Sequence, residues 1–242
     1  TMTEPIVRYY GPKAYSDHPP FKYPDYKSTI KRSPTHDPIK VVATLTETTG
    51  PGPAWAEITP EDADLTTNAG TGSPAIGERI IVTGRVLDEN GNGVPDTIVE
   101  VWQANACGRY VHWRETAFPA PLDPNFIGVG QCKTDAEGNY RFLTIKPGAY
   151  PWGNHPNAWR PPHIHFSILG PALVTRLVTQ MYFEGDPLLF QDPMYNSVPP
   201  HARERLVARY DHDVTEENWA LGWRFDIVLR GPNGNVEEME EE

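Results

Sequence analysis

Several features that would place a chain in a special class are scarce in this sequence. It has only two cysteines in 242 residues, Cys107 and Cys132. Two thiols are too few for a disulfide framework, and they lack the short spacing of a thiolate zinc site. Both are therefore expected to be small buried residues of the core.

The sequence also has no long apolar run and no excess of basic residues. No stretch reaches the roughly 18 apolar residues of a membrane-spanning helix, and no charged-then-apolar signal opens the chain. Lysine and arginine number 21 against 32 acidic residues, which gives a net charge of −11. Because nucleic acids attract basic surfaces, a nucleic-acid partner is unexpected. The expectation is a cytoplasmic protein that engages neither nucleic acid nor membrane.

What the chain does have is an abundance of turn residues. It contains 26 prolines and 20 glycines with no regular period, and 38% of its residues are hydrophobic. Such a composition indicates many loops around a real core. No internal repeat is visible. We expect one domain over residues 76–242, which is large enough to hold a catalytic site. An N-terminal arm and connector over residues 1–75 would precede it.

Short runs rich in β-branched residues predict an all-β fold, a β-sandwich core of mixed short strands with few short helices. Strands are expected at 41–45, 78–88, 94–105, 128–134, 138–146, 163–170, 175–183 and 223–231. One helix is expected near 202–210, and a single turn at 58–65 with Thr59 as its cap and Pro60 first. The run 88–93, DENGNG, resembles a calcium loop, but its twelfth position is Val99 and strands flank it, so calcium is discounted.

The two ends of the chain differ in character. The extended arm over residues 1–40 is rich in proline and aromatic residues, namely Tyr9, Tyr10, Tyr15, Phe21, Tyr23 and Tyr26. It cannot form its own core, so it either packs on its own domain or a partner chain, or stays a loosely ordered tail. The final run 237–242, EEMEEE, is expected to be a solvated acidic end.

A candidate metal site lies in the stretch 148–166, GAYPWGNHPNAWRPPHIHF. In a strand, His163 and His165 would project from the same face, with Ile164 in the opposite layer. Two imidazoles on one face make half of a metal site. The alternative is that the pair is ordinary half-buried packing.

Two tyrosines at strand ends could complete such a site. Tyr110 follows the strand that ends in VWQAN, and Tyr150 follows GNYRFLTIKPG. A phenol ionises near pH 10 unless a strong cation is close. Two phenolate oxygens with two imidazoles favour Fe(III) over zinc. The alternative for each tyrosine is a core aromatic with a hydrogen-bonded hydroxyl.

Several longer runs carry a resemblance to a known family. GERIIVTGRV, VEVWQANACGRY, PLDPNF, TIKPGAYPW, WRPPHIHF, TQMYFEGDPL, WRFDIVLRG and, in the arm, DYKSTIKRSP together resemble the intradiol ring-cleaving dioxygenases, and within them the β chains that act on protocatechuate. The resemblance extends over nearly the whole chain. It implies a non-haem enzyme with one Fe(III) per chain, in the breakdown of aromatic compounds by the β-ketoadipate pathway.

The resemblance also implies roles for individual residues. The iron ligands would be Tyr110, Tyr150, His163 and His165; the catalytic residues Arg160, Tyr150 and Gln180; and the substrate-binding residues Tyr26, Arg32, Trp102 and Trp152. Protocatechuate (3,4-dihydroxybenzoate) would be cleaved with O2 to 3-carboxy-cis,cis-muconate. A homologous α chain would pair with this one in αβ protomers of a larger oligomer.

Other readings stay open at this point. The family's pattern differs here at Cys107, Val111, Ala149 and Pro162, which leaves room for another 4-substituted catechol such as 4-sulfocatechol. Catechol and hydroxyquinol dioxygenases share the ligand pattern but usually carry a helical N-terminal segment, which the proline-rich arm does not offer. A non-catalytic β-sandwich assembly module is the alternative outside enzymes.

Overall fold

The computed structural model describes residues 15–39, 41, 44, 58–113, 119–170 and 176–238. The strand expected at 41–45 falls mainly outside these residues, and so do Tyr9 and Tyr10 of the arm. Among the described residues, no helix is both long enough and apolar enough to cross a bilayer.

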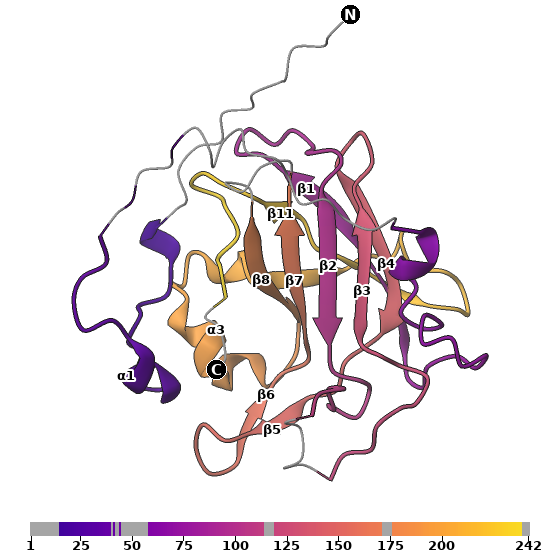
Figure 1. Cartoon of the computed structure of the whole chain (residues 1–242), viewed down its shortest axis with the longest axis horizontal. Helices are drawn as coiled ribbons and strands as arrows, with labels where there is room; N and C mark the ends of the chain where they lie inside the picture. Colours follow the sequence, from indigo (N-terminus) through magenta and orange to yellow (C-terminus); the bar gives the residue numbers. More distant parts are fainter. Residues whose placement is uncertain are drawn as a thin grey trace, which may run out of the picture.

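The described chain forms one large sheet and one small one (Figure 1). The nine strands of the large sheet are β1 (Arg79–Leu87), β2 (Ile98–Gln103), β3 (Val129–Lys133), β4 (Asn139–Ile145), β7 (His163–Leu169), β8 (Leu177–Phe183), β9 (Val207–Tyr210), β10 (Leu221–Arg224) and β11 (Ile227–Val228). The small sheet is the hairpin of β5 (Tyr150–Trp152) and β6 (Ala158–Arg160).

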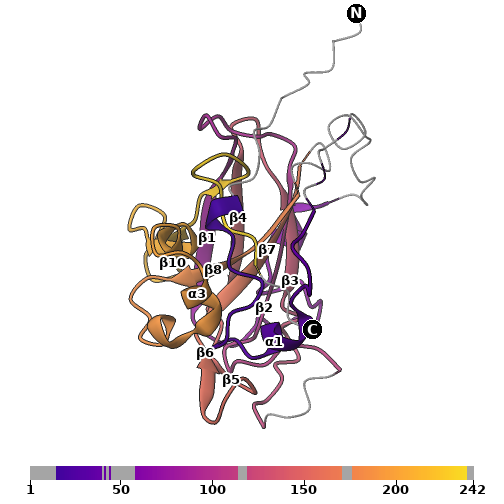
Figure 2. The same cartoon turned by 90° about the vertical axis from the view of Figure 1, so that its left-hand side faces the viewer.

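The large sheet folds back on itself into two layers. Antiparallel pairing in the order β3-β2-β7-β8 makes one layer, and β1 pairs with β4, β10 and β11 in the other. A short parallel pairing of β8 with β9 joins the layers. Figure 2 shows the two layers from the side. The predicted all-β sandwich is confirmed.

The core lies between the layers because the strands alternate. In β7, Ile164, Phe166 and Ile168 are almost completely buried in the main apolar cluster, to which β1 contributes Ile80 and Val82. Burying each such side chain stabilises the fold by about 1.5–3 kcal/mol relative to leaving it in water. The histidines of β7 therefore occupy the other face of the strand, as the period of two predicts.

Helices are few and short among the described residues. They are α1 (Ser28–Arg32), α3 (Pro193–Ser197) and the 3₁₀ turns η1 (Tyr15–Asp17), η2 (Pro60–Ala63), η4 (Leu189–Gln191) and η5 (Arg203–Leu206). The turn with Thr59 and Pro60 is confirmed, and the carboxylate of Asp62 accepts the backbone N–H of Thr59 at 2.8 Å.

Two of the predicted elements are wrong in extent or type. The helix expected at 202–210 is a single 3₁₀ turn followed by β9, because the end of this segment pairs with β8 and β10 instead of bonding to itself. The strand expected at 223–231 is broken between β10 and β11. There the carboxylate of Asp226, in place of a backbone carbonyl, accepts the N–H of Arg85 at 2.9 Å.

The described part of the arm packs on its own domain. Asn154 anchors it twice, since its side chain accepts the N–H of Lys27 at 2.8 Å and donates to the carbonyl of Asp25 at 2.7 Å. Nearer the N-terminus, the carboxylate of Asp17 accepts hydrogen bonds from Arg205 and His201, both at 2.7 Å. The helix α1 within the arm was not expected from the sequence.

The two cysteines are unpaired but not alike. Cys132 is half-buried against the core, whereas Cys107 is exposed, so the expectation of two buried thiols is wrong for Cys107. Cys107 is exposed because it occupies a turn, where its N–H donates to the side-chain carbonyl of Asn105 at 2.9 Å. Burial raises the pKa of Cys132 to about 12.

This difference predicts the reactivity of the thiols. At pH 8, a pKa of about 12 leaves roughly one Cys132 thiol in 10,000 ionised, and only the thiolate reacts. A thiol reagent at pH 8 is therefore expected to label Cys107 and spare Cys132 in the native protein, and to label both after unfolding. Peptide mass spectrometry measures the two sites separately. Equal labelling in the native state would contradict this description of the core.

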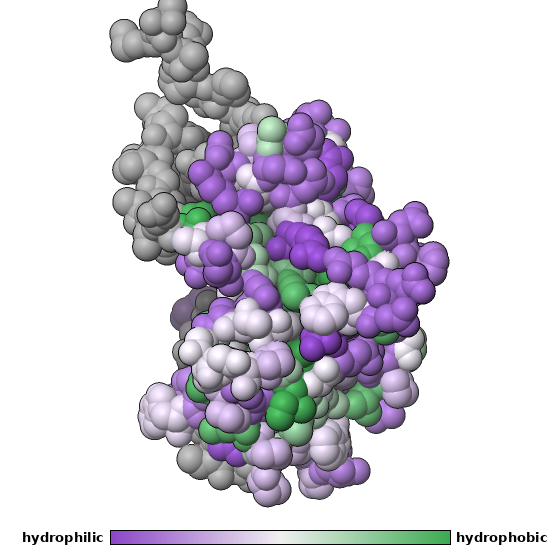
Figure 3. Space-filling view, turned by 90° about the vertical axis from the view of Figure 1, so that its right-hand side faces the viewer, coloured by the Kyte–Doolittle hydropathy of each residue, from purple (hydrophilic) through white to green (hydrophobic). Residues whose placement is uncertain are grey.

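One face of the molecule is mainly hydrophilic. Hydrophilic side chains cover most of the face shown in Figure 3, with small hydrophobic patches between them.

Candidate active site

The strand register places the candidate residues in two rows across the sheet. In one row, His165 of β7 lies between Trp102 of β2 and Gln180 of β8. In the next row, His163 lies opposite Tyr182 of β8. Trp102 and His165 are stacked with ring centres 4.7 Å apart and planes inclined by only 7°. Both histidines are buried.

Two tyrosines reach the same point from outside the large sheet. The hydroxyl oxygens of Tyr110 and Tyr150 lie 3.4 and 3.5 Å from Nε2 of His163. Their rings meet edge to face with centres 5.7 Å apart. The centres of the His163 and His165 rings are 5.0 Å apart. The four side chains that the sequence singled out therefore come together, although they come from the loop after β2, from β5 and from β7.

Each histidine has a defined partner on its Nδ1 side. His163 donates from Nδ1 to the carbonyl of Pro161 at 2.7 Å, and Nδ1 of His165 is 2.8 Å from the carboxylate of Glu238. Because Nδ1 of each ring is engaged in this way, Nε2 is the nitrogen whose lone pair can bind a metal. Burial lowers the pKa of His163 well below its ordinary value, and the nearby charges of Arg160 and His165 add to the shift. His163 is thus neutral at pH 7, as a metal ligand must be.

This arrangement fits a hard trivalent cation. It offers two phenol oxygens and two imidazole nitrogens, with no thiol among them. No group of three or more His, Cys, Asp or Glu side chains suited to a metal exists in the described part of the chain, so a site here depends on the tyrosines. Two phenolate oxygens together with two imidazole nitrogens favour Fe(III) over softer ions.

Arg160 is held in a buried network beside these residues. It pairs with Tyr150 across the β5–β6 hairpin and is completely buried. Its guanidinium donates to Gln180 at 2.6 Å, to the hydroxyl of Tyr182 at 3.1 Å and to the carboxylate of Asp192 at 3.3 Å. Burial raises the pKa of Tyr182 well above its ordinary value, and Asp192 adds to the shift. Tyr182 therefore keeps its proton and donates it to Gln180 at 2.8 Å.

An open pocket of about 800 Å³ borders the site. Tyr110, Tyr150, His165, Trp102, Trp152 and Gln180 all line it. Tyr26 and Arg32 do not. Tyr26 packs edge to face on Trp152 with ring centres 5.3 Å apart, and the guanidinium of Arg32 lies 4.9 Å from the centre of the Tyr26 ring. Their assignment to substrate binding stays a prediction.

Three residues of this region were missed from the sequence, namely Tyr182, Asp192 and Glu238. Asp192 pairs with Arg160 and also accepts the N–H of Met194 at 3.0 Å, which caps α3. Glu238 belongs to the run that was expected to be solvated, and that expectation is wrong for this residue. Its side chain is only 10% exposed because it is bonded to His165. A proline after Asp192 was a signal for the cap; nothing distinguished Glu238 from its neighbours.

Gly108 allows the loop of Tyr110 to approach Tyr150. Its φ is +77°, and an added Cβ would lie 2.2 Å from the carbonyl oxygen of Ala149. Gly108→Ala is therefore expected to destabilise the protein by about 1–3 kcal/mol and to displace Tyr110. Thermal unfolding and bound metal measure the two effects. Gly153→Ala is the matched control, because nothing lies within 4 Å of its added Cβ. Equal behaviour of the two variants would contradict this account of the loop.

Models of two known families match the chain. One, described as dioxygenase, matches residues 51–231, and one for the N-terminal part of the protocatechuate 3,4-dioxygenase beta subunit matches residues 12–42. This chain belongs to the intradiol dioxygenase family. As an intradiol dioxygenase it is an oxidoreductase that uses O2 in aromatic breakdown.

Individual relatives agree with this membership. The intradiol dioxygenase described here is 58% identical over 220 residues to the protocatechuate 3,4-dioxygenase beta chain of Burkholderia cepacia, which covers 91% of this chain and 93% of that one. The corresponding alpha chain of that organism is 30% identical over 169 residues, with 67% and 77% coverage. The solved structure of 3-chlorocatechol 1,2-dioxygenase from Rhodococcus opacus 1CP matches with a TM-score of 0.54 and 25% identity, over 74% of this chain and 70% of that chain.

Proposed function

We propose that this chain is the iron-holding subunit of an enzyme that cleaves protocatechuate between its two hydroxyls with O2, giving 3-carboxy-cis,cis-muconate. The observation that carries the proposal is the meeting of two phenol oxygens and Nε2 of His163 within 3.5 Å, beside His165 and an open pocket. The relative at 58% identity bears the name of a protocatechuate dioxygenase, which supports this substrate over other catechols.

Tyr110, Tyr150, His163 and His165 would hold one Fe(III) per chain. Bound there, the ion would supply a Lewis-acidic centre that chelates the deprotonated diol and draws electron density from its ring. The chain's own part is to orient both imidazoles and to leave Nε2 of each as the donor atom for the metal. The Nδ1 bonds to Pro161 and Glu238 do this without help from the metal.

Tyr150 is placed to take a proton from the incoming substrate. Its hydroxyl is buried at the inner wall of the pocket, and its strand also carries Trp152 of the pocket wall. As a phenolate it would be, like Tyr110, a stronger base than either imidazole of the proposed ligand set. Accepting the proton of one substrate hydroxyl at the Tyr150 oxygen would leave the diol with the negative charge that favours chelation.

Arg160 would stabilise negative charge that develops on the substrate. It is buried behind the pocket, so its charge acts in a medium of low dielectric, where it is strongest. Gln180 lines the pocket and accepts directly from Arg160, which connects the two catalytic candidates. The Trp102 ring stacks on His165 and lines the pocket with it, so it would limit where a substrate ring can lie.

A partner chain would close the pocket. Its rim includes three exposed apolar residues, Val111, Ile127 and Val129, each more than 40% exposed. We propose that a homologous α chain covers them in an αβ protomer of a larger oligomer, since an α chain is among the relatives. Residues 1–75 would then serve as arm and connector, and residues 76–242 as the catalytic domain. The two free cysteines fit a reducing compartment such as the cytoplasm.

This assembly makes a prediction about the isolated chain. Expressed alone, the chain is expected to be poorly soluble or to show at most about one hundredth of the turnover of the co-expressed pair, because an open pocket admits water and leaves the substrate loosely oriented. Solubility and O2 uptake measure this. Full activity of a monomeric preparation would contradict the need for a partner.

Product analysis tests the proposed reaction. The iron-loaded protein, co-expressed with its partner, is mixed with protocatechuate, and O2 uptake and the ring-opened product are measured together. Uptake of one O2 per substrate with formation of 3-carboxy-cis,cis-muconate is expected. Catechol, hydroxyquinol and 4-sulfocatechol serve as competing substrates. A higher kcat/KM for any of them would replace protocatechuate in the proposal, and no turnover of any diol would contradict it.

A further inference from the structure

The end of the described chain reaches the proposed metal site. Oε2 of Glu238 lies 2.8 Å from Nδ1 of His165, and each of these two side chains is only 10% exposed. The other histidine, His163, has a neutral carbonyl in the same position. A carboxylate is a stronger acceptor than a carbonyl, so the two imidazoles differ in the strength of the bond that orients them.

The segment before Glu238 is fastened to the domain by its backbone and side chains. The side chain of Asn235 donates to the carbonyl of Arg205. The backbone N–H of Asn235 donates to the carbonyl of Val228, and the N–H of Val228 donates to the side-chain carbonyl of Asn235. Thr179 donates to the carbonyl of Val236 at 2.6 Å, and Glu238 donates from its N–H to the carbonyl of Val178 at 2.9 Å. These bonds place the segment along β8.

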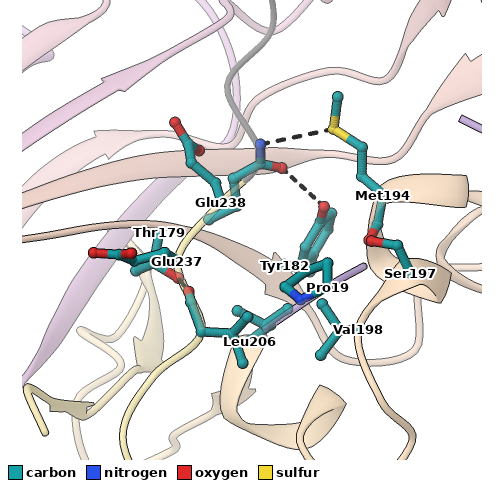
Figure 4. Close-up of a pocket in the computed structure, with 11 residues that line it drawn as sticks. Pro19, Thr179, Tyr182, Met194, Ser197, Val198, Leu206, Glu237 and Glu238 are labelled. Carbon is teal, nitrogen blue, oxygen red and sulfur yellow. Dashed lines mark hydrogen bonds between the residues drawn. The ribbon is translucent and has the colours of Figure 1, made fainter. Parts of the chain in front are cut away.

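Burial adds to this attachment. Val236 is only 4% exposed and belongs to a second apolar cluster with Tyr182, Leu189 and Leu206. Figure 4 shows Glu237 and Glu238 beside a small cavity of about 20 Å³, with their carboxylates pointing in different directions. The carboxylate of Glu238 lies within hydrogen-bond distance of His165. The position of its carboxylate is therefore set by the fold of the described residues.

We propose that Glu238 is a positioning residue for His165, and that residues 234–238 are the strap that delivers it. The inference rests on the proposed function, because it assigns Glu238 to the metal site. The carboxylate accepts the Nδ1 proton of His165, which keeps the lone pair on Nε2 and fixes the turn of the ring. The Trp102 ring stacked on His165 limits tilting of the imidazole, but it would still allow a ring flip that exchanges the positions of Nδ1 and Nε2. Glu238 supplies that missing constraint.

Removing the carboxylate should weaken metal binding without removing a ligand. Loss of such a partner typically costs 10- to 100-fold in metal affinity. Glu238→Ala is therefore expected to lower the iron affinity about 10- to 100-fold. Glu238→Gln keeps the size and an acceptor oxygen but not the charge, so its loss is expected to fall between Ala and wild type. Equilibrium competition with an iron chelator, on the assembled protein, measures the affinity.

A spectrum and a matched control separate positioning from general stability. Glu237→Gln removes the same charge one residue away and is expected to keep wild-type affinity. The visible absorption band of the iron-loaded protein is expected to shift in Glu238→Ala but not in Glu237→Gln, while the metal-free proteins unfold at similar temperatures. Wild-type affinity and an unshifted band in Glu238→Ala would overturn the inference. Wild-type protein that binds no iron would instead contradict the proposed function and this inference with it.

Discussion

The His165→Ala variant is expected to purify with less than about one tenth of the wild-type iron and to have no measurable ring-cleaving activity. His165 would supply one of four protein donors, and its removal also leaves the Glu238 carboxylate without its partner. Losing a ligand outright should cost more than the 10- to 100-fold in affinity that loss of an orienting partner costs. Metal analysis of the purified protein measures the effect directly.

The chain provides a matched control for this variant. His155 lies on the exposed turn between β5 and β6, where its ring contacts the carbonyl of Pro156. His155→Ala removes the same side chain close to the site in sequence and is expected to keep full iron content and activity. Full metal occupancy in His165→Ala would remove this residue from the ligand set.

The Arg160→Ala variant is expected to lower kcat by about 100- to 1000-fold while iron content stays near that of the wild type. This is the range for removing one group that stabilises charge in a transition state. The guanidinium is not among the proposed ligands, so metal retention should not depend on it. Its contacts with Gln180, Tyr182 and Asp192 keep its charge at one place before the substrate arrives.

This variant needs a companion because Arg160 is part of a buried ion pair. Both side chains of the pair with Asp192 are fully buried, and removing one partner leaves an uncompensated charge at a cost of about 3–5 kcal/mol. The double variant Arg160→Ala/Asp192→Asn removes both charges and should regain stability but not turnover. Wild-type kcat in a folded double variant would show that the charge is dispensable for the reaction.

Local pattern was sufficient to predict most strands of the sheet and the face of β7 that carries the two candidate histidines. The period of two in β7 placed His163 and His165 on one face and Ile164 in the core, and the structure has them there. The same kind of local reasoning failed at residues 207–210, where pairing with two neighbouring strands decides the conformation. Helix propensity depends only on the local sequence, so it takes no account of strand partners that are distant in the chain.

The other half of the site depends on contacts between distant segments. Nothing in the spacing of Tyr110 and Tyr150 says that their hydroxyls approach the same imidazole nitrogen; only the resemblance to a family brought them together. The structure supplies a physical reason in Gly108, whose missing side chain lets one loop lie against the other. Glu238 lies 73 residues from His165, and its contact depends on a strap whose sequence has no distinctive pattern.

The visible spectrum of the iron-loaded protein, recorded without O2 before and after adding protocatechuate, tests the central claim most directly. The account predicts a visible band from tyrosinate bound to Fe(III) and a clear change of that band when the diol displaces a ligand. An iron-containing preparation with no visible band, or with a band that protocatechuate leaves unchanged, would contradict the proposal that Tyr110 and Tyr150 bind the metal to which the substrate is delivered.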